Sequence, residues 1–264
     1  MDYKIIDFHT HAFPDKIAAK ATENLHSHYK MKPVSEGYYT DLLECAARVN
    51  VSNIVVHATA TKATQVENVN NYIASLKDEY NDLLIGFGTI HADYEDYKTE
   101  LKRVVALGLR GIKLHCDFQG FDIDTPKMMP IYEEIVRLGL PILFHLGDRK
   151  LRHARPKRLA RVLDEFPEMT AIGAHFGGVF MWDEAIEYLV GKDLYFDTSS
   201  ALFELEIDKA IYIIKNHGED KMLFGTDFPL ADYDTELERF FKLPLNEVQR
   251  KKILAENAIR LLRL

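Results

Sequence analysis

The feature that most constrains the fold of this chain is a regular alternation of short apolar runs with stretches of helical periodicity. Runs rich in β-branched and aromatic residues are typical of buried strands, whereas apolar residues spaced three and four apart are typical of helices. Strands are predicted at 4–8, 53–57, 83–89, 110–115, 141–145, 170–175, 194–197 and 222–225. Helices are predicted at 39–50, 64–80, 94–107, 127–138, 156–166, 182–190, 205–216 and 246–262.

This alternation predicts parallel strands joined by crossover helices, and eight repeats in a chain of 264 residues match the size of a (β/α)₈ TIM barrel. A doubly wound open sheet is the alternative architecture. Its dinucleotide-binding members carry a glycine-rich loop after the first strand, but here that turn reads His-Thr-His-Ala-Phe-Pro. We therefore predict a single α/β barrel domain over residues 1–264.

The segment 13–38 is longer than a typical connection between a strand and a helix. It contains one predicted helix, at 16–30, and a looser stretch before the next helix begins. Two interpretations stay open for this insertion near the barrel mouth: a flap over the mouth, or a surface excursion without a role.

Composition narrows the class of partner. The formal net charge is −8 and the pI is about 5.8, which argues against nucleic-acid binding because phosphates require clustered cations. No apolar run approaches the roughly 20 residues of a membrane span, and no signal peptide is evident. Only two cysteines occur, so neither a disulfide framework nor a cysteine-rich zinc site is indicated. We expect a cytoplasmic protein with a small-molecule substrate; a homodimer is compatible with this architecture.

Two histidines follow the first predicted strand, and barrel enzymes place their chemistry at such strand ends. Side chains at positions i and i+2 of a strand share one face, so His9 and His11 can bind the same metal ion. His26 and His28 have the same spacing but lie in a predicted helix, where i and i+2 do not face each other. The first pair is therefore the better metal candidate.

The other predicted strands also end in polar residues. Burial of so many polar side chains would be costly without compensation, and a bound metal supplies it. The residues are His57, His91, Lys113, His115, His145, His175, Asp197 and Asp227.

Several of these positions fall in a recognisable order of motifs. They are His9-Thr-His11, His145, Ala174-His175-Phe-Gly-Gly, Gly225-Thr-Asp227-Phe-Pro and the closing helical segment from Ile253. Over nearly its full length the chain resembles the amidohydrolase superfamily of metal-dependent barrels, and most of all its aminocarboxymuconate-semialdehyde decarboxylase-like branch.

The resemblance implies a mononuclear centre. His9, His11, His145 and Asp227 become ligands of one divalent ion, with Zn²⁺ preferred and Mn²⁺ also suited, and His175 becomes an acid/base. We expect a hydrolase of a small lactone, ester or amide, in which Asp227 accepts the proton of a metal-activated water. The alternatives are a nonoxidative decarboxylase of an aromatic or dienoic carboxylate and a metal-stabilised binding protein without turnover. No strand is followed by the glutamate of adenosine-deaminase-like enzymes.

Lys113 and His115 share a face of the fourth predicted strand, and both are substrate-binding candidates. For Lys113 three roles stay open. In binuclear amidohydrolases a lysine near this position is carboxylated and bridges two metals; an ordinary ammonium group would bind substrate or form a structural ion pair.

Three further residues are weaker substrate-binding candidates. Arg149 and Arg152 follow the fifth strand in a basic stretch, where a guanidinium fork suits a substrate carboxylate. A solvated basic face is the plainer explanation. Trp182 lies shortly after the sixth strand and would either line an apolar substrate pocket or pack a helix on the barrel.

Overall fold

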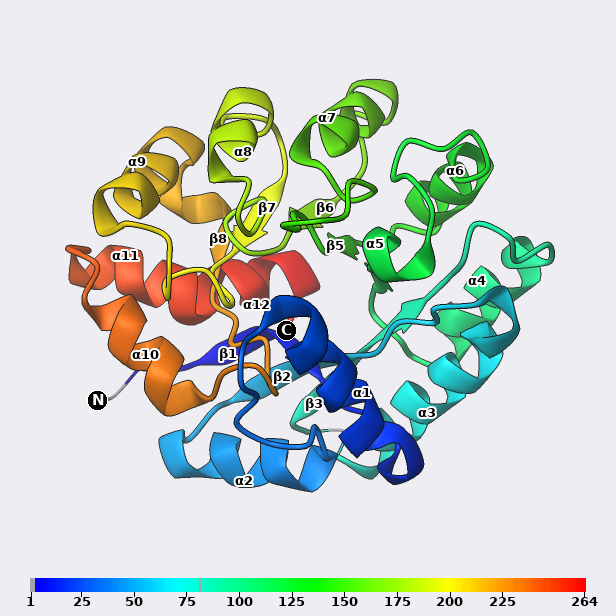
Figure 1. Ribbon diagram of the computed structural model, residues 1–264, viewed down its shortest axis with the longest axis horizontal. Helices are drawn as coiled ribbons and strands as arrows, with labels where there is room; N and C mark the ends of the chain where they lie inside the picture. Colours follow the sequence, from blue (N-terminus) through cyan, green and yellow to red (C-terminus); the bar gives the residue numbers. More distant parts are fainter. Residues whose placement is uncertain (1–2, 81) are drawn as a thin grey trace.

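A computed structural model describes residues 3–80 and 82–264 of the chain. Its eight strands are parallel and pair in chain order from β1 to β8 (Figure 1). Phe8 N donates to Phe224 O at 2.8 Å, which links the last strand to the first and all but closes the sheet. The predicted TIM barrel is confirmed. The strands are β1 Ile6–His11, β2 Asn53–His57, β3 Leu84–Thr89, β4 Ile112–Leu114, β5 Ile142–Phe144, β6 Ala171–Gly173, β7 Tyr195–Asp197 and β8 Met222–Leu223.

Helices surround the barrel and close one end of it. They are α1 Asp15–Tyr29, α2 Tyr39–Val49, α3 Val66–Glu79, α4 Tyr97–Ala106, α5 Cys116–Gln119, α6 Met129–Arg137, α7 Pro156–Glu165, α8 Trp182–Tyr188, α9 Ile207–His217, α10 Tyr233–Phe241, α11 Glu247–Lys251 and α12 Asn257–Leu262. A π-helical turn, Lys252–Glu256, joins the last two, so the predicted closing helix is one continuous element.

The predictions missed two helices. The short α5 fills the turn after β4, where His115 caps it by accepting from Phe118 N. The longer α10 follows β8 and begins at Asp232, whose side chain accepts from Thr235 N at 2.9 Å. Asp232 is therefore the N-cap of α10, and aspartate is a residue that is preferred at this position.

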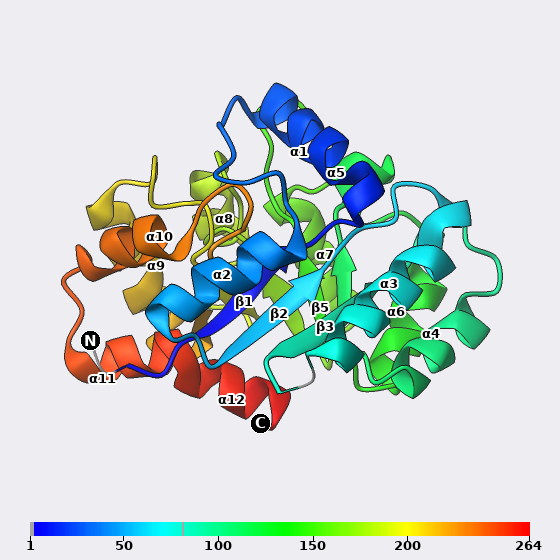
Figure 2. The same ribbon diagram turned by 90° about the horizontal axis from the view of Figure 1, so that it is seen from below.

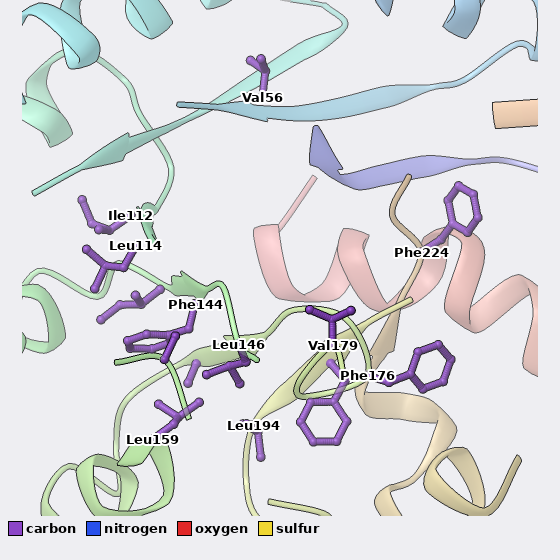
Figure 3. Packing of buried hydrophobic residues seen from close by; sticks show 14 of the residues in the cluster. Val56, Ile112, Leu114, Phe144, Leu146, Leu159, Phe176, Val179, Leu194 and Phe224 are labelled. Atoms are coloured by element: carbon purple, nitrogen blue, oxygen red, sulfur yellow. The ribbon is translucent and has the colours of Figure 1, made fainter. Parts of the chain in front are cut away.

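The core has two parts. One fills the barrel, where Ile6, Phe8 and Leu143 meet Ala258 and Leu262 of α12. The other lies between the strands and the helices around them, and Figure 3 shows part of it. Because both faces of the strands are buried, the strands read as continuous apolar runs, and polar side chains are left for the strand ends.

A bulge in β1 sets the direction of the first two histidines. From Asp7 to Thr10, β1 advances three residues while the paired β2 advances two. Phe8 packs inside the barrel, and the next residue, His9, also points inward, to other histidine rings. Adjacent residues can share a face only where the alternation is interrupted, as in a β-bulge. The bulge therefore brings His9 and His11 into the barrel mouth.

The insertion 13–38 contributes α1, which lies across the barrel end that the strands point to, opposite α12 (Figure 2). Only Ala18 and Thr22 of α1 are buried. Among the described residues, no helix has the length and apolar composition that crossing a membrane requires.

Candidate metal centre and substrate cavity

His9, His11 and Asp227 converge at the barrel mouth. Asp227 Oδ1 lies 3.2 Å from His11 Nε2 and 3.4 Å from His9 Nε2. Neighbouring ligand atoms around a zinc ion with bonds of about 2.0–2.1 Å are separated by roughly 3.3 Å, so this spacing suits a shared ion. Burial is the largest influence on the pKa of Asp227 and acts upward, but attraction to His9 and the bond to His11 hold that pKa below its usual range.

Asp197 at the end of β7 forms hydrogen bonds to His9 of β1 and to the backbone of His175, which follows β6. Its Oδ2 lies 2.8 Å from His9 Nδ1, and its Oδ1 accepts from His175 N at 2.9 Å and from Ser199 Oγ. Burial would raise the pKa of Asp197, but attraction to His9 and their hydrogen bond lower it to about 2. A carboxylate on one imidazole nitrogen fixes the tautomer and leaves the other nitrogen free for a metal. His9 therefore presents Nε2.

Burial also prepares the histidines to act as neutral ligands. It lowers the pKa of His9 to about 3, with the positive charge of Lys113 acting in the same direction. It lowers the pKa of His11 as well. Neutral imidazole is the form that binds metals, so neither ring has to lose a proton at neutral pH.

The rings of His145 and His175 face each other with two nitrogens that both lack a proton. His145 Nε2 lies 2.9 Å from Gly147 O, and His175 Nδ1 lies 2.8 Å from Ser199 O. A carbonyl only accepts, so each of these nitrogens carries its ring's proton. The remaining nitrogens, His145 Nδ1 and His175 Nε2, are 3.1 Å apart, and both present lone pairs. A proton or a cation between or beside them would relieve this contact.

His57 is a further buried histidine beside the pair from β1. Its ring centroid lies 5.0 Å from that of His9 and 4.5 Å from that of His11, and their nitrogens are close enough to share an ion. Within the described part of the chain, neither ring nitrogen of His57 has a hydrogen-bond partner. Orphaned buried nitrogens are costly, and a nearby cation is the partner that such a cluster lacks. The donor set fits a divalent metal.

Lys113 lies beneath this cluster. Its Nζ is 3.0 Å from His9 Nε2, and the side chain is fully buried. Burial lowers the pKa of Lys113 to about 8, against attraction to Asp197 and Asp227. The Lys113 ammonium group therefore places a positive charge beside His9 Nε2.

His115 lies in the wall of the cavity, stacked between two other rings. Its ring centroid is 3.9 Å from that of Phe118 and 3.8 Å from that of His145, with interplanar angles of 6° and 7°. The His115 ring therefore packs on one face of the His145 ring.

The other three predicted substrate-binding residues lie elsewhere. Arg149 stacks on Phe180 and pairs with Glu204, and Arg152 donates to the carbonyls of Asp148 and Leu151. Among the described residues, the cavity wall includes Phe180 but neither arginine nor Trp182. Trp182 Nε1 donates to His175 O at 3.0 Å, so this indole supports the backbone of the acid/base candidate.

That backbone has an unusual conformation. His175 and Asp227 have φ values of 61° and 65°, in the left-handed region that non-glycine residues seldom adopt. Bonds from His175 N to Asp197 and from Asp227 N to His9 O hold the two segments there. Such conformations cluster at functional sites.

Above these residues lies a cavity of about 540 Å³. Its floor includes His11, His145, His175 and Asp227, and its wall is largely apolar. Much of that wall comes from the insertion 13–38, including α1. The apolar and aromatic wall residues include Phe13, Ile17, Leu25, Tyr29, Val69, Tyr72, Phe118, Val179, Phe180 and Leu230.

Tyr29, at the end of α1, reaches the floor of the cavity. Its Oη lies 3.1 Å from His115 Nε2 and 3.2 Å from His145 Nε2. Burial raises the pKa of this phenol well above its usual range, so it keeps its proton. Sequence reasoning missed Tyr29 because nothing in residues 13–38 indicates which side chain faces the barrel. Asp197 and His57 were visible as polar strand ends, but the sequence does not show their partners.

Comparison with known proteins identifies the family of the chain. A model of the amidohydrolase family matches residues 6–264. The chain belongs to the amidohydrolase family. The chain is 30% identical over 117 residues to 2-amino-3-carboxymuconate-6-semialdehyde decarboxylase of Dictyostelium discoideum, a match covering 42% of this chain and 33% of that protein. It therefore spans about a third of the length of this curated relative.

Solved structures share the fold along nearly the whole chain. An uncharacterized TIM-barrel protein from Bordetella bronchiseptica superposes with a TM-score of 0.80 at 21% identity, covering 98% of both chains. The 5-carboxyvanillate decarboxylase of Novosphingobium aromaticivorans, complexed with manganese and 4-hydroxy-3-methoxy-5-nitrobenzoic acid, has a TM-score of 0.76 at 16% identity and covers 100% of this chain and 97% of its own. At these identities the likeness concerns the fold.

Proposed function

We propose that this protein is a metal-dependent, nonoxidative decarboxylase of a small carboxylate with a planar, apolar body. The observation that carries the proposal is the contrast within the cavity, which has a floor of histidines and a carboxylate beneath a largely apolar wall. A carboxylate group would bind at the floor while the rest of the molecule packs against the wall. The decarboxylases among the relative and the structural neighbours support this alternative better than the hydrolase that the sequence favoured.

Four residues would hold one divalent ion, through His9 Nε2, His11 Nε2, His145 Nδ1 and an Asp227 oxygen. The donor set suits Zn²⁺ or Mn²⁺. When bound, the ion supplies positive charge that orients the substrate carboxylate and polarises it. His57, whose ring nitrogens have no hydrogen-bond partner among the described residues, lies next to His9 and His11 of this set.

His175 would take up a proton and transfer it to the substrate. Its Nδ1 is bonded to Ser199 O, so Nε2 is the atom that can take up a proton and deliver it into the cavity. When the bond to the departing CO₂ breaks, its electron pair stays on the substrate carbon, which must then be protonated. His175 lines the cavity floor, where that carbon would lie. The apolar wall excludes competing water.

A substrate panel separates the two reactions. The protein, loaded with Zn²⁺ or Mn²⁺, is offered aromatic and dienoic carboxylates in one series and lactones, esters and amides in the other. We expect CO₂ release from members of the first series. Ring opening or ester cleavage without CO₂ release would establish the hydrolase instead.

A further inference from the structure

The phenol of Tyr29 belongs to α1, yet it meets the two histidines that end β4 and β5. Its ring is held from several sides. The His28 ring packs edge-on against it with centroids 4.7 Å apart, and His28 Nε2 lies 2.5 Å from Asp148 Oδ2 in the loop after β5. Phe118 lies on another side, with centroids 5.9 Å apart. The position of the hydroxyl is therefore fixed by the barrel as well as by α1.

The hydrogen bonds around Tyr29 determine where its own proton can go. His115 Nδ1 accepts from Phe118 N at 3.3 Å, so the proton of that ring is on Nε2. His145 Nε2 faces Gly147 O and also carries its proton. Both nitrogens next to Tyr29 Oη are therefore donors, and neither can accept from the hydroxyl. Among the described residues, these two nitrogens are the polar partners of Tyr29 Oη.

We propose that Tyr29 is a substrate-binding residue whose hydroxyl donates to an oxygen atom of the bound molecule beside His145. Tyr29 lines the cavity, and its hydroxyl proton has no acceptor among the described residues, so a ligand oxygen is the missing partner. The assignment rests on the proposed function, because it takes the ligand to be an oxygen-bearing carboxylate. It also gives the insertion a direct part in recognition: α1 supplies a hydrogen-bond donor to a floor otherwise built by strand ends.

Calorimetric titration of the Mn²⁺-loaded protein with benzoate and with 2,6-dihydroxybenzoate tests the assignment. Tyr29→Phe keeps the ring and removes only the hydroxyl. We expect it to weaken binding of at least one probe by roughly tenfold or more, the effect of losing a hydrogen bond to a charged group, while the metal content stays unchanged. Dissociation constants within twofold of the wild type for both probes would overturn the assignment.

His28→Leu is the matched control, because it removes the hydrogen bond that anchors α1 on Asp148 and keeps the hydroxyl of Tyr29. We expect it to weaken both probes less than Tyr29→Phe weakens the affected one. Equal weakening by the two variants would show that only the position of α1 matters, and would overturn the role of the hydroxyl. If neither probe binds the loaded wild-type protein, the proposed function fails and the Tyr29 assignment fails with it.

Discussion

The floor and the wall of the cavity are built in different ways. The floor consists of side chains at strand ends, and the residues that support it, His9 and Asp197, are completely buried. Much of the wall comes from the insertion 13–38, whose helix α1 buries only Ala18 and Thr22. Barrel enzymes vary their substrates through loops while the strands position the chemistry. The comparison suggests that the floor sets the reaction and the wall selects the molecule.

The largest effect should follow from changing His175, the proposed proton carrier of the floor. His175→Asn removes Nε2 as a proton carrier, and we expect kcat for CO₂ release to fall by about 10²–10⁴-fold with the metal content unchanged. Rate measurements and elemental analysis on the same preparation check this. Full activity in the variant would contradict the role of His175. His153→Asn, at a half-buried position that pairs with Asp122 and does not line the cavity, is a control that should change neither quantity.

Substitution of Lys113 tests how a buried charge beside the floor affects the stability of the protein. Burial lowers its pKa to about 8 from an ordinary 10.5, so between those values the unfolded chain binds more protons than the folded one. The free energy of unfolding of the metal-free protein should therefore rise with pH across this window, by on the order of 3 kcal/mol for this group. Lys113→Met should remove that rise, which urea unfolding at several pH values would measure. Identical slopes in both proteins would contradict the buried charge.

Substitution of Asp197 tests whether this carboxylate positions His9, the first of the proposed metal ligands. Asp197→Asn removes the carboxylate that orients His9, and we expect metal affinity to fall by roughly 10–100-fold, as for other residues that orient a metal ligand. Competition with a chelator measures the affinity. Asp193→Asn, an exposed change just before the same strand, should leave it unchanged. Equal affinity in Asp197→Asn would show that His9 needs no such orientation.

The smallest effects are expected outside the wall. Arg149 pairs with Glu204 and Arg152 binds backbone carbonyls, so neither guanidinium is directed into the cavity. Arg149→Met and Arg152→Met should each leave KM within about twofold, since exposed ion pairs contribute little. A tenfold rise in KM would show instead that these arginines bind the substrate.

The same contrast explains what could be predicted from the sequence. Eight apolar runs predicted the order of the strands, and strand ends meet at one edge of a barrel, so the polar residues after the strands could be grouped before their distances were known. The resemblance to the amidohydrolase superfamily then selected His9, His11, His145, His175 and Asp227 among them. The bulge in β1 could not be predicted, because no residue there requires it. Bonds between distant segments, such as Asp197 to His9, depend on tertiary geometry. Tyr29 was missed because a helix crossing the mouth leaves no periodic signal of which residue points inward.

The central claim is that the floor holds one divalent ion, and anomalous diffraction from crystals of the protein grown with Mn²⁺ tests it most directly. We predict a single anomalous peak per chain, in contact with His9, His11, His145 and Asp227. Two peaks bridged at Lys113, or one peak bound by His9, His11 and His57 without Asp227, would contradict this account of the centre.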